Sequence, residues 1–342
     1  GAQVVVQCAE LDPNVEFFQK LGFEVRLVFP AHDPRRVVVE GFGMLLRLER
    51  VAGTPAPVTL VIPREDPGPP LRAPCGALVE FVSKTAAIPT PALKQELIFS
   101  SGDTEGSGWV VGRAGMRYRD LCPGFYGGQF IASHICIPEG GPVPDYVHFH
   151  KIHFQLIFVA KGWVKVVYED QGDPFIMYPG DCVVQPPEMR HQVLESSAGL
   201  EVIEVGGPAE HETWRDTGMT LPNGLGPPGR RWNGQTFCRH QAQHGEWKPI
   251  GGNWEQMATG VHQATGGRAD VRVLRPTAAA CQLPVHADFT LVAVWSGTAR
   301  ATVAGQEARG VGPALDAFVV PGQARVEFEG CSADLKILVV GA

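Results

Sequence analysis

The sequence predicts a mainly β protein, in which two tandem barrels follow a small module of one helix and several strands. Three observations predict this class. The 342 residues include 41 Gly and 29 Pro but only 8% aromatic residues, which is typical of a chain with many turns. Short alternating segments separated by turn signals fill residues 109–207, at about the spacing of a sandwich or barrel. Their order then recurs in residues 246–342, which indicates a tandem duplication.

The first 83 residues are expected to form a separate module with the order βαβββ. A short apolar run at residues 4–6 is followed by Asp12 and Pro13, an N-cap and a first-turn proline for a helix that ends at Gly22. Three strands are expected after this helix, at residues 23–29, 36–40 and 44–49.

This order resembles one module of the vicinal-oxygen-chelate (glyoxalase/bleomycin-resistance) family. Residues 74–80 resemble the closing strand of that family, whose Glu, here Glu80, is often a metal ligand. Gln7 stands near the position of the family's histidine, and a second module is largely missing. A structural or dimerisation role is therefore favoured over a metal site, and a homodimer is one expectation.

The rest of the chain is expected to contain two barrels and two connections. Residues 84–108 and 208–245 are rich in Pro, Gly or Ser and are expected to be a linker and a connector. Strands of the first barrel, 109–207, are expected at residues 128–138, 147–150, 154–160, 164–168, 182–185, 191–194 and 200–205. The second barrel is expected in residues 246–342.

Three histidines of the first barrel have metal-site spacing. His148 and His150 are one residue apart, so on a strand their side chains point to the same face. His191 follows a Gly/Pro turn and can complete the triangle from a neighbouring strand. Since neutral imidazole is the commonest ligand for Zn, Fe, Ni and Cu, these residues are the expected ligands of one divalent metal ion.

The spacing resembles the two motifs of the cupin family. The first, G-x5-H-x-H-x3,4-E-x6-G, fits the two histidines and Gly162, with Gln155 in place of the Glu. The second, G-x5-P-x-G-x2-H-x3-N, fits Gly180, Pro186 and His191. The resemblance implies two tandem cupin (double-stranded β-helix, jelly-roll) barrels with a pocket inside the first. Because the family's Glu is a metal ligand, Gln155 is expected as an optional neutral ligand or as a residue that orients a metal-bound group.

Other polar residues leave alternatives open. His153 has the parity of Gln155 and could be a fourth ligand, a base beside the metal or an outward loop residue. The second alternative is favoured, so His153 and Gln155 are the candidate catalytic residues. His134 could line the pocket or face outward, and His211 is expected to be structural.

The second barrel is expected to lack a metal. His286 approximates one motif histidine, whereas Pro284, Thr290 and Val326 stand at the other ligand positions. A barrel that has lost its ligands is most simply a scaffold or a dimer wall.

Charge and cysteine usage restrict the partners. The net charge is −7, the isoelectric point is near 5.9, and Lys and Arg form no run longer than two, which argues against nucleic acid. No apolar run reaches the roughly 18 residues of a membrane span. Eight cysteines without C-x-x-C pairs favour free thiols in a reducing cytoplasm.

The expected chemistry follows from the neutral ligand set. Three histidines and Gln155 leave a divalent metal with its full positive charge, so the site should attract a small anionic or enolisable chelating substrate. With Fe(II), which is favoured, the expected enzyme is a non-haem iron dioxygenase. With Zn, Ni or Mn it is a redox-neutral isomerase, lyase or cyclase. A non-enzymatic small-molecule-binding protein with a structural metal is the third alternative.

Overall fold

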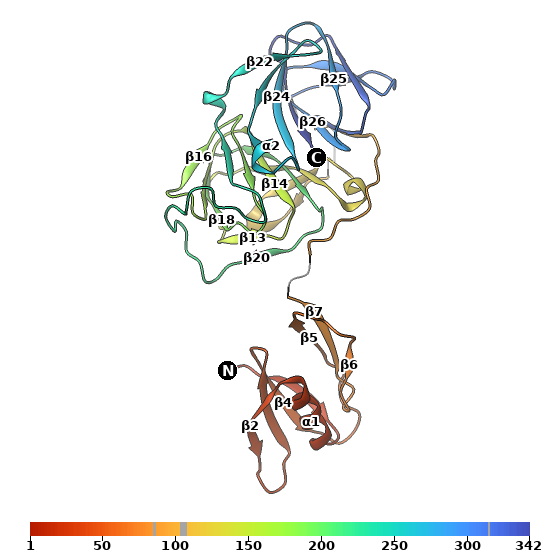
Figure 1. Ribbon diagram of the computed structural model, residues 1–342, viewed down its shortest axis with the longest axis vertical. Helices are drawn as coiled ribbons and strands as arrows, with labels where there is room; N and C mark the ends of the chain where they lie inside the picture. Colours follow the sequence, from red (N-terminus) through yellow and green to blue (C-terminus); the bar gives the residue numbers. More distant parts are fainter. Residues whose placement is uncertain (85–86, 103–107, 314) are drawn as a thin grey trace. The chain divides into compact units, whose positions relative to one another are not determined.

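The protein consists of two compact units, residues 1–87 and 88–342 (Figure 1). The structure, a computed structural model, describes residues 1–84, 87–102, 108–313 and 315–342. None of the helices in these ranges is long and apolar enough to cross a membrane.

The N-terminal unit has the predicted order βαβββ. Strands β1 (Val4–Cys8), β2 (Glu24–Phe29), β3 (Arg36–Gly41) and β4 (Met44–Arg50) form a sheet in the order β1-β4-β3-β2, and α1 (Asp12–Leu21) follows β1. Asp12 is the first helical residue rather than the N-cap, which is Leu11. Gly22 ends the helix at φ 105°, a left-handed conformation that glycine adopts without strain. A second sheet in the order β5-β7-β6 comprises β5 (Thr59–Arg64), β6 (Leu71–Arg72) and β7 (Leu78–Ser83).

The first barrel consists of two sheets, in the orders β21-β17-β14-β19-β11-β10-β9 and β16-β15-β18-β13-β20. All seven predicted strands are present, as β11 (Ile131–Ile137), β13 (His148–His150), β14 (Phe154–Lys161), β15 (Val164–Tyr168), β17 (Cys182–Gln185), β18 (His191–Ser196) and β19 (Leu200–Gly207). The strands that were not predicted are short: β9 (Val110–Val111), β10 (Arg117–Asp120), β12 (Gly141–Pro142), β16 (Phe175–Met177), β20 (Thr213–Arg215) and β21 (Cys238–His240). Three single turns, η1 (Arg113–Gly115), η2 (Phe125–Gly128) and η3 (Ala242–His244), lie between strands.

The second barrel repeats this pairing, as the duplicated sequence predicts. Its sheets have the orders β22-β23-β24-β31-β26-β29-β8 and β25-β30-β27-β28, so β29-β26-β31-β24 corresponds to β17-β14-β19-β11 of the first barrel. The elements are β22 (Trp247–Ile250), β23 (Trp254–Ala258), α2 (Val261–Ala264), β24 (Asp270–Pro276), β25 (Ala280–Pro284), β26 (Phe289–Ser296), β27 (Ala299–Val303), β28 (Arg309–Val311), β29 (Ala317–Pro321), β30 (Arg325–Glu329) and β31 (Lys336–Gly341).

The two predicted connections are more ordered than expected, because each supplies a strand to a barrel. Strand β8 (Ile98–Ser100) lies in the predicted linker and pairs with β29 of the second barrel. Strand β21 lies in the predicted connector and pairs with β17 of the first barrel. Each barrel sheet is therefore extended by the chain segment that precedes the other barrel.

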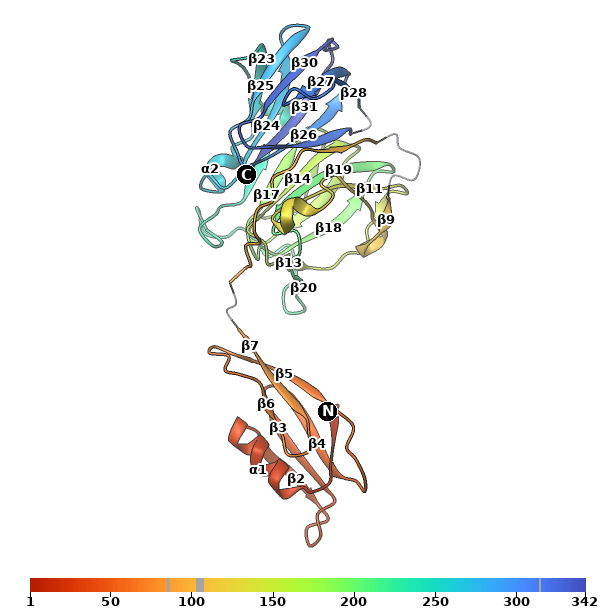
Figure 2. The same cartoon turned by 90° about the vertical axis from the view of Figure 1, so that its right-hand side faces the viewer.

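The barrels share an apolar core in which one sheet of each faces the other (Figure 2). The rings of Phe130 and Phe289 stack with their centroids 4.3 Å apart. The indole N–H of Trp295 donates a hydrogen bond to the carbonyl oxygen of Ala160 at 2.9 Å. These contacts leave the far side of the β14 sheet free to face the interior of the first barrel.

Candidate metal centre

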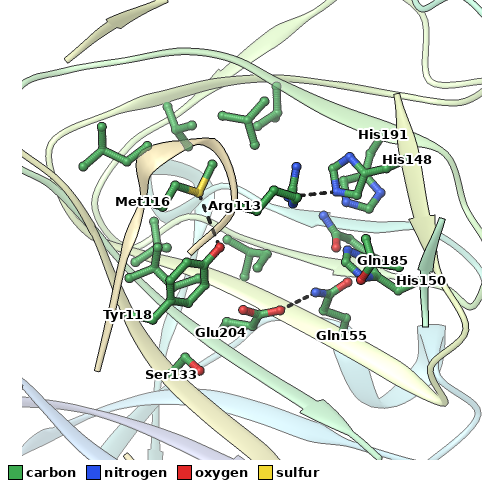
Figure 3. A pocket seen from close by; sticks show the side chains of 18 of the residues that line it. Arg113, Met116, Tyr118, Ser133, His148, His150, Gln155, Gln185, His191 and Glu204 are labelled. Carbon is green, nitrogen blue, oxygen red and sulfur yellow. Dashed lines mark hydrogen bonds between the residues drawn. The ribbon is translucent and has the colours of Figure 1, made fainter. Parts of the chain in front are cut away.

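A cavity of about 430 Å³ occupies the interior of the first barrel (Figure 3). Alternate residues of β11, β15 and β19 line it with apolar side chains, among them Ile135, Val166 and Val202. Its polar lining comprises Arg113, Tyr118, Ser133, His148, His150, Gln155, Tyr168, Gln185, His191, Glu204, His211 and Thr213. The cavity therefore combines apolar walls with a group of polar side chains that includes the three histidines.

The three predicted histidines come together at this cavity. His148 on β13 lies directly across from His191 on β18, and His150 follows two residues later on the same face. One nitrogen from each ring lies within 4.8 Å of the others, and all three side chains are buried. Among the residues that the structure describes, this is the only group of three or more His, Cys, Asp or Glu side chains that could hold a metal ion.

The second nitrogen of each ring is fixed by a hydrogen bond. The Nδ1–H of His148 donates to the carbonyl oxygen of Tyr146 at 2.8 Å, and the Nδ1–H of His191 donates to that of Met189 at 3.0 Å. His150 Nδ1 lies 2.8 Å from the hydroxyl oxygen of Thr213. For His148 and His191 the carbonyl partner places the proton on Nδ1, so Nε2 offers its lone pair, as in metal-binding histidines. For His150 the Thr213 hydroxyl can accept from Nδ1–H and so support the same form.

Burial keeps the three rings neutral. It lowers the pKa of His148, with the Arg113 guanidinium as the next cause, and lowers the pKa values of His150 and His191 well below the ordinary value. For His150 and His191 the neighbouring histidines add to this effect. Neutral imidazole is the form that binds metal, so the site is prepared for a metal at neutral pH.

Arg113 stands beside the histidines and was not predicted. Its Nη2 donates to His148 Nε2 at 3.1 Å, and its Nη1 donates to the fully buried carboxylate of Asp145. Asp145 also accepts hydrogen bonds from the backbone N–H groups of Tyr146 and Val193. The guanidinium is thus held at the edge of the metal centre. No sequence pattern indicated it, because η1 precedes both cupin-like motifs.

Gln155 lines the same cavity, as predicted, and pairs across the strands with Gln185. Its amide nitrogen donates to Glu204, whereas Gln185 Nε2 donates to the Tyr168 hydroxyl at 2.7 Å. Within the described residues, the Oε1 atoms of both glutamines are buried without a hydrogen-bond partner. Leaving such an acceptor unsatisfied costs about 1–3 kcal/mol. A group bound in the cavity could satisfy both.

His153 does not lie where the favoured interpretation put it. Its side chain lines a different pocket, with Nε2 3.1 Å from the hydroxyl oxygen of Thr90. Strand β13 ends at His150 and β14 begins at Phe154, so the intervening turn breaks the alternation on which the parity argument depended. The structure therefore does not bring this candidate base to the other site residues.

The structure also places His134 and His211, for which the sequence left the position open or indicated a structural role. His134 faces away from the cavity, with Nε2 3.1 Å from Glu201 and Nδ1 3.1 Å from Arg119. His211, expected to be structural, lines the cavity with its ring centroid 5.3 Å from that of His150. Its Nδ1–H donates to the carbonyl oxygen of Pro208 at 3.0 Å, which leaves Nε2 as an acceptor.

The equivalent place in the second barrel is apolar. The cross-strand pair that corresponds to His148 and His191 is Leu283 and Val326, and Val285 follows at the position of His150. All three are buried in the core of that barrel. His286 and Pro284, aligned with the ligands from sequence, are exposed, so that alignment was one residue out of register. Thr290 is buried at the position of Gln155.

The two metal-ligand positions suggested for the N-terminal unit can be described within that unit. Glu80 is exposed, and Gln7 accepts a hydrogen bond from the backbone N–H of Ala56 at 3.1 Å.

Comparison with known proteins identifies the fold. No family model and no curated protein matches the chain. Among solved structures, the protein Ylba from E. coli matches with a TM-score of 0.52 at 12% identity, over 75% of this chain and 95% of its own. Oxalate decarboxylase from Bacillus subtilis, in a structure at pH 4.6, matches with a TM-score of 0.52 at 14% identity, over 73% of this chain and 76% of its own. At these identities the likeness concerns the fold, and the protein is a mainly β chain with two tandem cupin barrels.

Proposed function

We propose that the first barrel holds one divalent metal through His148, His150 and His191, and that the protein is a metal-dependent enzyme acting on a small organic anion. The observation that carries this proposal is the convergence of three buried imidazoles at one cavity. The donor set fits the metal, because three nitrogen donors with fixed second nitrogens suit Fe(II), Zn, Ni or Mn. Fe(II) is the favoured ion.

The cavity supports a substrate with an anionic group and a small apolar body. The Arg113 guanidinium and a metal would compete for His148 Nε2, so metal binding frees an N–H donor beside the centre. Such a donor suits a carboxylate or enolate. The Ile, Val, Leu and Met side chains of the wall suit the rest of the molecule, and about 430 Å³ limits it to a small one.

The favoured reaction is oxygenation by a non-haem iron dioxygenase. A bound Fe(II) would supply the electron-transfer chemistry that a reaction with O₂ needs. Arg113 would hold the anionic group, and the apolar walls would contact the rest of the substrate.

Glu204 supports a second candidate, a redox-neutral isomerase, lyase or cyclase. This carboxylate lines the cavity and accepts a hydrogen bond from Gln155. A carboxylate at that position can take a proton from an enolisable substrate, which needs no oxidant.

Oxygen uptake separates the alternatives. The apo-protein would be loaded with Fe(II) without oxygen, titrated with 1,3-dicarbonyls and phenols, and then exposed to O₂ in an oxygen electrode. Stoichiometric O₂ uptake with substrate loss supports the dioxygenase. Product formation without O₂ uptake, with Zn, Ni or Mn as well, supports the redox-neutral enzyme. Binding without turnover under every condition would contradict an enzymatic role.

A further inference from the structure

The carboxylate that the first cupin-like motif lacks is present on the neighbouring strand. Gln155 occupies the motif position on β14, and Glu204 lies on β19, where it pairs with Ile157. Positions 155 and 157 of β14 face the same cavity, so Glu204 and Gln155 are diagonal neighbours on that face. The Gln155 side chain, 3% exposed, donates its amide N–H to Glu204.

This contact determines which way the Gln155 amide points. An ionised carboxylate can only accept hydrogen bonds, so the nitrogen of the amide must face Glu204. The amide oxygen then points away from Glu204, toward the side where His150 lies (Figure 3). That oxygen has no hydrogen-bond partner among the described residues. Through this hydrogen bond, Glu204 orients the buried Oε1 of Gln155 toward the histidines.

We propose that Glu204 is a positioning residue that holds Gln155 Oε1 as a neutral fourth donor toward the metal. This inference rests on the proposed metal site. The negative charge of the pair then lies on Glu204, which is hydrogen-bonded to the proposed ligand Gln155, and not on the ligand itself. The ligands then leave the metal's charge free for an anionic substrate, and the hydrogen bond to Glu204 polarises the amide oxygen.

Metal affinity of the full chain tests the inference without measuring turnover. Zn(II) affinity would be measured by competition with a chelator, and the Co(II) absorption spectrum would report the ligand set. In Glu204→Gln, the new amide can meet Gln155 with either its N–H or its oxygen, so the orientation of Gln155 is lost. We expect affinity to fall about 10- to 100-fold, with a changed Co(II) spectrum, as for other partners that orient ligands.

A charge-exchanged variant provides the rescue. Gln155→Glu alone would place a second carboxylate beside that of Glu204. Because the two like charges repel each other, we expect weaker metal binding or a lower melting temperature. In the double variant Gln155→Glu/Glu204→Gln, the new amide donates to the new carboxylate, so metal affinity should return to at least the wild-type value. Rescue would show that the pair acts through orientation and charge, not through packing alone.

Glu201→Gln is the matched control, because Glu201 lies on the same strand but bonds His134 and Lys161 outside the cavity. It should leave affinity and spectrum unchanged. If wild-type protein binds one metal and Glu204→Gln leaves affinity and spectrum unchanged, or the double variant fails to rescue, the inference is wrong while the metal site stands. If wild-type protein binds no metal, both proposals fail.

Discussion

The two barrels have the same strand order but opposite interiors. At one cross-strand position the first barrel has His148 and His191, and the second has Leu283 and Val326. The first encloses a cavity with buried polar groups, whereas the second is filled by apolar side chains such as Phe318 and Phe328. The cupin fold thus does not depend on its ligand positions, which can serve either a site or a core.

The difference has an energetic consequence. Apolar burial in the second barrel contributes roughly 25 cal/mol per Å² to folding. The first barrel instead buries neutral histidines and two glutamine oxygens that have no hydrogen-bond partner within the described part of the chain, and this polar burial opposes folding. We therefore expect a bound metal and substrate to stabilise the first barrel, and the second barrel to be stable without a ligand.

The largest expected effect is the removal of a core side chain from the second barrel. Phe318 is fully buried against Phe99 and Phe328, so Phe318→Ala should lower the free energy of unfolding by about 3–5 kcal/mol. Ile157 borders the cavity of the first barrel, and Ile157→Ala should cost less than about 2 kcal/mol. Urea unfolding followed by tryptophan fluorescence would compare them. Equal losses would mean that the first barrel is as tightly packed as the second.

Acid should destabilise the metal-free first barrel. The folded pKa values of His148, His150 and His191 lie below their unfolded values. Below about pH 6.5 the unfolded state therefore binds more protons than the folded state, which favours unfolding. Stability is complete above that pH and should fall by up to about 1.4 kcal/mol per pH unit for each histidine. Urea midpoints at pH 7.5 and 5.5 would test this. A variant with all three changed to Gln should show a flatter dependence, and an unchanged slope would contradict the assignment.

The smallest effect concerns Arg113. Arg113→Gln removes the guanidinium that bonds His148 Nε2, so metal affinity should stay equal or rise slightly. Affinity for an anionic chelator at the metal-loaded site should fall about tenfold, or about 1.4 kcal/mol. The exposed Arg117 provides the control, since Arg117→Gln should change neither quantity. Calorimetric titration of the metal-loaded wild type and both variants with acetylacetone measures the chelator affinity. Equal affinity in the wild type and Arg113→Gln would mean that Arg113 does not bind the substrate.

Sequence alone could predict the barrels and the metal centre where the signal was local. His148 and His150 share a face by strand alternation, and His191 follows from the second motif. Gln155 was placed in the cavity by its motif offset. The seven strands of the first barrel were found because apolar segments between Gly and Pro turns mark them clearly.

The remaining site residues lacked such a signal. Strand β19 carries apolar residues and one glutamate on each face, because one face lines the cavity and the other packs toward the second barrel. Alternation therefore could not tell which glutamate, Glu201 or Glu204, faces the cavity. Arg113 reaches the centre from outside the motifs, and His211 does so from a loop after β19. His153 was misplaced because alternation does not continue through the turn between β13 and β14. These positions depend on tertiary packing rather than on local pattern.

Metal content tests the contrast between the barrels most directly. Purified protein, reloaded with Fe(II) or Zn(II) and freed of excess ion, would be analysed for metal per chain beside His148→Ala/His150→Ala and His286→Ala. We predict one ion per chain for the wild type and for His286→Ala, and none for the double variant. Equal metal content in all three proteins would contradict the assignment of the site to His148, His150 and His191.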